Sequence, residues 1–181
     1  MNPDRSLQVK SGDVRLAVNI YGAEQQSTLI LVHGYPDSSE VWAQLLAPLS
    51  QQFRVVTYDV RGAGQSSVPA TTADYALEKL AADFRVVLEA VSPDQPVHLV
   101  AHDWGSIQSW ESVAAPQLQT RLKSFTTISG PCFDHVGFWL RDALRSSAPL
   151  ALRRAARVTN SPCTSAVIAI RLDANSRPRS A

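Results

Sequence analysis

Charge of a single sign, long apolar runs and cysteine are all scarce in this 181-residue sequence. Its 17 lysine and arginine residues are balanced by 16 aspartate and glutamate residues, which gives no support to nucleic-acid binding. The uninterrupted aliphatic runs, such as 29–32 and 166–170, are far shorter than the roughly 18 residues of a membrane-spanning helix. Residues 1–13 are polar and lack the apolar stretch of a secretory signal. We therefore expect neither a nucleic-acid partner nor a transmembrane segment.

The two cysteines, Cys132 and Cys163, form neither the spacing of a metal site nor a disulfide framework. Their small number favours a reducing compartment. We therefore expect a cytoplasmic protein without a metal centre. A chain of this length usually forms one domain and buries roughly 70% of its unfolded surface in one core.

Short apolar runs alternate with amphipathic stretches through the first 133 residues, which is the pattern of a mostly parallel sheet covered by helices. The first two runs flank a turn at Gly12 and predict an antiparallel opening hairpin. The predicted strands are 7–9, 14–21, 28–32, 54–58, 97–101 and 123–128. The sequence thus predicts an α/β fold.

Three amphipathic helices are expected between these strands. The first begins at a capping box of Asp37 and Glu40, the second ends before Pro93, and the third runs from Trp104 to about Ala115. Apolar side chains recur at helical spacing, and we interpret them as core. They are Val41, Trp42, Leu45, Leu46 and Leu49 in the first helix, and Tyr75, Leu80, Phe84, Val87, Leu88 and Val91 in the second.

The first motif is His33-Gly34-Tyr35-Pro36, which follows the third predicted strand. Backbone N–H groups at the carboxyl ends of parallel strands can point into a cleft, and Gly34 permits a tight turn there. Taken alone, the motif is short, and an ordinary turn from a strand to a helix explains it better.

The second motif is D-V-R-G-A-G-Q-S-S at 59–67, whose glycines are Gly62 and Gly64. It differs from a dinucleotide-binding loop because a serine replaces the third glycine, and the acidic residue about 20 positions on belongs to a helix. We therefore predict no nucleotide or other cofactor. The expected role is structural, with Asp59 and Arg61 binding each other.

The third motif is Ala101-His102-Asp103-Trp104-Gly105, which spans a strand end and a helix start. A sharp turn that exposes a nucleophile needs small residues two positions before and two after it, and Ala101 and Gly105 satisfy this need around Asp103. A carboxylate attacks strained or activated carbon, such as an epoxide or an alkyl halide, and water then opens the resulting ester. The alternative is that Asp103 only caps the following helix.

Together the three motifs resemble the epoxide hydrolase branch of the α/β-hydrolase fold family. The resemblance rests on H-G-Y-P at 33–36, D-V-R-G-A-G-Q-S-S at 59–67 and H-D-W-G at 102–105. The stretch 97–141 further resembles the hydrolase half of bacterial fusions of an epoxide hydrolase with a short-chain dehydrogenase. The resemblance covers roughly 5–158.

This resemblance implies that Asp103 is the nucleophile and that the backbone amides of Tyr35 and Trp104 form the oxyanion hole. It also implies a small apolar epoxide as the substrate. Haloalkane dehalogenases share the aspartate, but they commonly carry an asparagine after the His-Gly pair. Tyr35 stands at that position here, which favours the epoxide.

In the epoxide hydrolases that the chain resembles, a helical cap follows the sixth strand, and two later strands bring the triad acid and the base histidine. The histidines of this sequence are His33, His98, His102 and His135, and none follows a late strand. Only 51 residues follow Gly130, fewer than the roughly 60 that two βα units take. We therefore expect a C-terminally truncated hydrolase that does not turn over.

Three further residues bear on this expectation. His135 comes too early for the base of the family, so we expect a cap or surface role for it. No tyrosine follows Tyr75, so the cap tyrosines that protonate the oxirane oxygen in these relatives are absent. Asp134 lies where some relatives supply the triad acid, although capping of a helix at 136–144 explains it as well.

We expect a core of six strands at 1–132, the start of a helical cap at 133–158, and a loose or disordered tail at 159–181. The charge changes at the same place, because nine basic and 13 acidic residues precede position 134, whereas eight basic and three acidic residues follow from there. The tail is rich in Ser, Thr, Asn and Pro, and we expect at most one short strand in it, near 167–172.

Two classes of function stay open. As an enzyme, the chain would open an epoxide through an alkyl-enzyme ester, and a haloalkane dehalogenase-like reaction shares this chemistry. As an inactive fragment, pseudoenzyme or interaction module, it would expose its sixth strand, 123–128, at the edge of the sheet. Unpaired backbone groups at such an edge favour self-association.

Overall fold

The computed structural model describes residues 1–132, 134, 136–138, 141–142 and 167–171. In this part of the chain seven strands form one sheet in the order β1-β2-β4-β3-β5-β6-β7. The strands are β1 (Arg5–Ser11), β2 (Val14–Tyr21), β3 (Thr28–Val32), β4 (Arg54–Tyr58), β5 (Val97–His102), β6 (Leu122–Ile128) and β7 (Val167–Arg171). Strands β4, β3, β5 and β6 run parallel, whereas β1, β2 and β7 pair antiparallel. The predicted α/β sheet with an antiparallel opening hairpin is confirmed.

The central strands β3 and β4 are buried at every position, because elements cover both faces of the sheet. The register places Ile30 of β3 between Val56 of β4 and Leu99 of β5. Near-continuous apolar runs of this kind identify buried parallel strands. Three predicted strands accordingly have the observed bounds, namely 14–21, 28–32 and 54–58.

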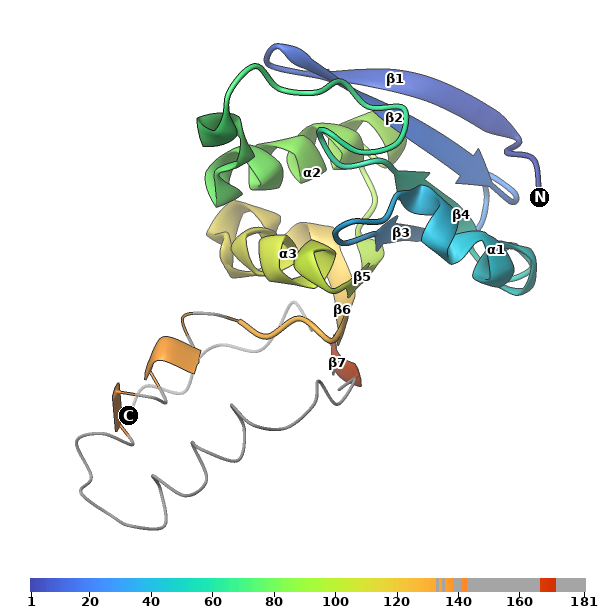
Figure 1. Cartoon of the computed structure of the whole chain (residues 1–181). Coiled ribbons are helices and arrows are strands. Elements are labelled where there is room, and N and C mark those ends of the chain that lie inside the picture. Colours follow the sequence, from blue (N-terminus) through green and yellow to red (C-terminus); the bar gives the residue numbers. More distant parts are fainter. Residues whose placement is uncertain (133, 135, 139–140, 143–166, 172–181) are drawn as a thin grey trace.

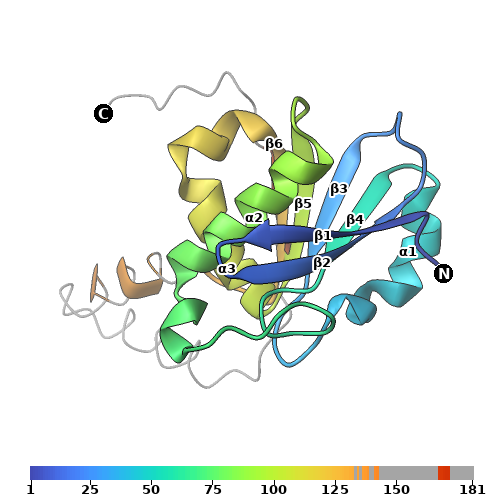
Figure 2. The ribbon, with the colours of Figure 1, turned by 90° about the horizontal axis from the view of Figure 1, so that it is seen from above.

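Within residues 1–132, three α-helices, each joined to a 3₁₀ turn, cover the sheet. They are α1 (Ala43–Ser50) after η1 (Ser39–Trp42), α2 (Leu77–Val91) after η2 (Thr72–Tyr75), and α3 (Trp104–Ala114) before η3 (Pro116–Arg121). Helices α2 and α3 lie on one face, and α1 lies on the other (Figure 1, Figure 2). Strand β3 serves both faces, because Ile30 and Val32 pack in the cluster with α2, whereas Leu29 and Leu31 pack in the cluster with α1.

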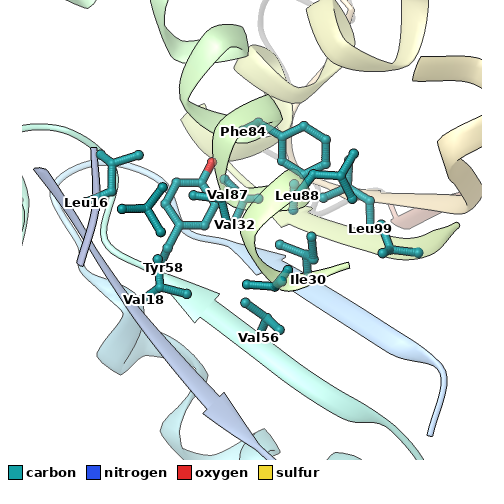
Figure 3. Close-up of a cluster of buried hydrophobic side chains, with 14 of the residues drawn as sticks. Leu16, Val18, Ile30, Val32, Val56, Tyr58, Phe84, Val87, Leu88 and Leu99 are labelled. Atoms are coloured by element: carbon teal, nitrogen blue, oxygen red, sulfur yellow. The ribbon is translucent and has the colours of Figure 1, made fainter. Parts of the chain in front are cut away.

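Figure 3 shows the larger cluster of buried side chains, where α2 packs on the sheet. Phe84, Val87 and Leu88 of α2 are at most 3% exposed, and burying each such side chain contributes roughly 1.5–3 kcal/mol. They pack with side chains of four strands, labelled Leu16, Val18, Ile30, Val32, Val56, Tyr58 and Leu99. This packing fixes α2 beside the strands whose carboxyl ends carry the three motifs.

The start of the first helix differs from the sequence prediction. Ser38, and not Asp37, is the N-cap residue, and its hydroxyl accepts the backbone N–H of Glu40 at 3.3 Å. A 3₁₀ turn has three residues per turn, so η1 changes the phase of the apolar stripe before α1 begins. Val41 and Leu45 are therefore exposed by 43% and 46%, and only part of the predicted core stripe is buried.

Tyr75 also departs from the predicted core. It lies in η2, before α2 begins, and its side chain is 42% exposed. The backbone leaves helical geometry at Ala76, where ψ is 144°. The residues that continue the predicted stripe from Phe84 to Val91 are buried as expected.

The outer edge of β6 is not free, because β7 pairs with it in antiparallel register. The expectation that the sixth strand lies at the edge of the sheet is therefore wrong, because β7 is the edge strand on this side, whereas self-association through a sheet edge stays a prediction. The short strand expected near 167–172 supplies the pairing, and its V-I-A-I sequence is rich in β-branched residues that favour a strand. The expected cap helices beyond residue 142 and the rest of the tail lie outside the described residues.

Candidate active site

Asp103 occupies a sharp turn between β5 and α3. Its φ of 55° and ψ of −127° are rare for a residue with a side chain, and such strain costs roughly 1–3 kcal/mol. The Asp103 side chain makes no capping hydrogen bond to α3. Its Oδ1 instead accepts the backbone N–H of Tyr35 at 3.1 Å. Asp103 is therefore the N-cap residue of α3 by position, as the alternative expects, but its side chain does not cap the helix.

Gly34 and Gly105 allow the chain to close around this turn. A Cβ on Gly34 would overlap Oδ1 of Asp103 and lie 2.6 Å from its Cβ. A Cβ on Gly105 would overlap the backbone of His33 and lie 2.6 Å from the carbonyl oxygen of Val32. Because these neighbours are backbone and the candidate nucleophile itself, neither position has room for a side chain.

The buried ring of His33 connects the first motif to the second. Its side chain is 1% exposed, Nε2 accepts the N–H of Val60 at 2.9 Å, and Nδ1 lies 2.8 Å from the carbonyl oxygen of Gly34. Because Nε2 must accept, Nδ1 carries the proton and donates it to Gly34. Burial lowers the pKa of His33 below its usual value. His33 is thus a neutral, fully hydrogen-bonded residue that positions the two loops.

The predicted pairing of Asp59 with Arg61 is wrong. The carboxylate of Asp59 accepts the backbone N–H groups of Ser39 and Gln65, each at 2.8 Å. One amide lies at the start of η1 and the other in the 59–67 loop. They satisfy the carboxylate, whereas Arg61 pairs with Asp83 instead. The 59–67 loop is nevertheless structural, as the sequence suggested, because Asp59 ties it to the segment after the first motif.

Arg61 turns instead to α2. Its Nε and Nη2 donate to the two carboxylate oxygens of Asp83 at 2.7 and 2.6 Å, a bidentate pair of the strong kind. The guanidinium also donates to the carbonyl oxygens of Asp74 and Lys79 at 2.5 and 3.2 Å. The bond to Asp83 raises the pKa of Arg61. This buried pair therefore anchors the second motif to α2, a partner that lies 22 residues away in the sequence.

A cavity of about 960 Å³ lies beside Asp103. All four residues of the first motif line it, and so do Gly62 and Gly64 of the second motif and Trp104 and Gly105 of the third. Asp103 itself is not among the lining residues, but two of its neighbours, Gly34 and Tyr35, are. The structure thus brings all three motifs to one cavity, next to the candidate nucleophile.

The cavity also contains a residue that sequence reasoning missed. Gln108 lines it from α3 and is 7% exposed. The available signal was its spacing, because Gln108 lies four residues after Trp104 and therefore on the same face of the helix.

Other candidates lie away from this arrangement. The ring of His102 meets Trp42 edge-on at 6.5 Å, and its Nδ1 has no hydrogen-bond partner in the described part of the chain. Asp134 is exposed, and among the described residues no hydrogen bond joins it to Asp103. His135 lies outside the described residues.

The described residues show neither a metal-binding cluster nor a membrane-spanning helix. Within residues 1–132, 134, 136–138, 141–142 and 167–171 no group of three or more His, Cys, Asp or Glu side chains is arranged for a metal ion. In the same part of the chain no helix has the length and apolar character needed to cross a bilayer.

Comparison with known proteins agrees with this geometry. The model of the alpha/beta hydrolase fold family matches residues 27–154. A Mycobacterium tuberculosis protein named probable oxidoreductase EphD is 43% identical over 132 residues, which are 73% of this chain and 22% of that protein. Epoxide hydrolase 4 of Mus musculus is 30% identical over 117 residues, 64% of this chain and 32% of that protein. A mutant epoxide hydrolase of Vigna radiata has a TM-score of 0.64 at 25% identity, over 70% of this chain and 39% of that one.

The parallel sheet, the strained residue at the end of β5 and the family match define one class of protein. The chain belongs to the alpha/beta hydrolase fold family. Its relatives place it near the epoxide hydrolases of that family. The chain spans less than a third of the length of either curated relative.

Proposed function

We propose that Asp103 is the nucleophile of an epoxide-opening hydrolase. One carboxylate oxygen forms a bond to a ring carbon of the epoxide, the bond between that carbon and the ring oxygen breaks, and the resulting alkoxide takes a proton from water. The product is an ester between Asp103 and the opened substrate. The observation that carries this proposal is the strained backbone of Asp103. Its side chain does not cap α3, and its Oδ1 accepts a hydrogen bond from the amide of Tyr35.

The contact with Tyr35 suits the second step as well as the first. If the other oxygen attacks, Oδ1 becomes the carbonyl oxygen of the ester and gains negative charge when water adds to the carbonyl carbon. The N–H of Tyr35 then stabilises that charge without moving, and the amide of Trp104, the first residue of α3, is the second donor of the oxyanion hole. A donor in this role is typically worth roughly 100- to 1000-fold in rate.

The cavity supports a small apolar epoxide as the substrate. Its walls include Val41, Val60, Leu77 and Leu80, together with the exposed ring of Trp104. The names of the mouse and Vigna radiata relatives point to the same chemistry in those proteins. We further propose a cytoplasmic location, which the scarcity of cysteine supports.

We also propose that the ester accumulates when this chain acts on its own. The general base of such a reaction must reach the ester carbonyl. His33 is buried with both ring nitrogens hydrogen-bonded, and Nδ1 of His98 lies 2.8 Å from Ser124 Oγ. Neither can therefore activate water beside Asp103, and His102, which packs edge-on against Trp42, does not line the cavity. We therefore expect the first half of the reaction to outpace the second.

Intact-protein mass spectrometry after incubation with styrene oxide tests this proposal. We expect a persistent adduct of one substrate mass in the wild type and none in Asp103→Asn. Asp94→Asn, which removes an exposed carboxylate, is the matched control and should behave as the wild type. An adduct that forms equally in Asp103→Asn would show unspecific alkylation and would overturn the assignment.

The same experiment separates the two other candidate functions. An alkyl bromide probe that modifies Asp103 faster than styrene oxide would favour a dehalogenase-like reaction, which uses the same carboxylate. A folded sample that forms no adduct with either probe would favour an inactive protein or an interaction module.

A further inference from the structure

Gln108 is a buried polar residue whose side-chain amide has no hydrogen-bond partner within the described part of the chain. Its side chain lines the 960 Å³ cavity and is 93% shielded from solvent, since its exposure is 7%. The oxygen and nitrogen of this amide are not among the buried side-chain atoms that lack a partner in the described part of the chain, so the amide is open to the cavity. A ligand that enters the cavity would supply the missing partner.

The surroundings of Gln108 decide what kind of ligand this is. Trp104, one turn earlier on α3, and Leu80 of α2 give the cavity apolar walls. The cation at the cavity, Arg61, is already neutralised by Asp83. Asp37 and Glu40 add negative charge to the lining, which disfavours an anion. The charges therefore disfavour an anion, and the part of the ligand along these walls is apolar.

We propose that Gln108 determines the specificity of this cavity by binding a neutral group that both donates and accepts a hydrogen bond, such as a carboxamide or a hydroxyl. The side-chain amide has a carbonyl oxygen and two N–H donors, so a primary carboxamide pairs with it through two hydrogen bonds at once. The rest of the ligand lies along the apolar wall. This inference rests on the proposed function, because Gly34 and Tyr35 both line the cavity and adjoin the Asp103 carboxylate.

Two non-reactive ligands test the inference on the full 181-residue chain. Calorimetric titration compares 3-phenylpropanamide with its N,N-dimethyl derivative, which keeps the carbonyl oxygen but has no N–H donor. A neutral hydrogen bond alters affinity by roughly fivefold to tenfold. We expect the wild type to prefer the primary amide by this factor and Gln108→Leu to bind both ligands with equal affinity.

Gln119→Leu is the matched control, because Gln119 is exposed on η3, away from the cavity. It should keep the wild-type preference. Gln108→Met keeps the length of the side chain but removes its amide, and it should also lose the preference, which covers the case in which the leucine variant does not fold. A preference that survives in either Gln108 variant, or a wild type that binds neither ligand or does not distinguish them, would overturn the inference and leave the cavity to water.

This result is independent of the reaction of Asp103, because neither ligand contains an epoxide. If the primary amide is preferred in a Gln108-dependent manner while no styrene oxide adduct forms, only the proposed reaction fails. If the adduct forms on Asp103 while the two amides bind alike, only the role of Gln108 fails.

Discussion

The backbone N–H of Tyr35 donates a 3.1 Å hydrogen bond to Oδ1 of Asp103, although the two residues are 68 positions apart in the sequence. The bond connects the loop after β3 with the turn after β5, and these two strands are neighbours in the sheet. It forms because Gly34 has no side chain to separate the loop from the carboxylate. One carboxylate oxygen is thereby fixed before any substrate binds, which is the preorganisation that an oxyanion hole requires.

Gly34→Ala should therefore abolish most of the reaction of Asp103. The new Cβ would overlap the carboxylate, and a displacement of about 1 Å at a reacting group costs roughly 100-fold in rate. The measurement is the rate of styrene oxide adduct formation, with circular dichroism to monitor folding. Gly137→Ala is the control, because a Cβ there meets no atom within 4 Å. A Gly34→Ala rate within about twofold of the wild type would contradict the proposed geometry.

Asp83→Asn should destabilise the fold strongly. Asp83 and Arg61 form a buried pair whose side chains are 2% and 6% exposed, and removal of one partner from such a pair typically costs roughly 3–5 kcal/mol. The free energy of unfolding in urea measures this effect. Lys79→Met, which removes the more exposed ion pair with Asp74, should change it far less.

A double variant refines this prediction. Arg61→Met combined with Asp83→Leu leaves no buried charge, so it should be more stable than Asp83→Asn alone. If Asp83→Asn unfolds at the same urea concentration as the wild type, the anchoring of the second motif to α2 has been misjudged.

Stability should fall as the pH is lowered through the range in which free histidine takes up a proton. Burial lowers the pKa of His33 below 6.5, although its bond to Gly34 and the charges of Asp59 and Asp37 oppose this. Below pH 6.5 the unfolded chain binds a proton at His33 that the folded chain does not bind, so acid favours unfolding. The contribution of His33 is thus present above pH 6.5 and is lost as the pH falls through the lower folded pKa.

Two measurements check this expectation: an NMR titration of the His33 ring, and the free energy of unfolding at pH 7 compared with that at pH 5. His98 has a lowered pKa as well, from burial and from Lys123, so it contributes in the same direction. His98→Asn is the control that removes this second contribution and should leave part of the pH dependence in place. A His33 titration midpoint above 6.5 would contradict the buried, neutral state.

The sequence predicts the fold well where the signal is local. The apolar β-branched runs of β3 and β4 identify those strands to the residue, because strands buried on both faces need such side chains throughout. The position of Asp103 between a strand and a helix is predicted by local signals too, because an apolar run precedes it and a helical stretch follows it. Ser38 displaces Asp37 as the helix cap because competing capping residues one position apart give nearly the same pattern.

Long-range choices of partner were not predictable in the same way. Arg61 has an aspartate two residues away and another 22 residues away, and only the packing of α2 on the sheet decides for Asp83. The unpartnered amide of Gln108 depends on the shape of the cavity, which no periodicity in the sequence reports. Partner identity and cavity shape are tertiary properties, so they required the structure.

The most direct test of the proposed chemistry is to locate the adduct. After incubation with styrene oxide, the protein is digested and the peptides are sequenced by tandem mass spectrometry. We predict that the added mass lies on Asp103 and that its yield falls in Gly34→Ala but not in Gly137→Ala. Modification confined to exposed carboxylates or to Cys132, with Asp103 unmodified in a folded sample, would contradict the assignment of Asp103 as the nucleophile.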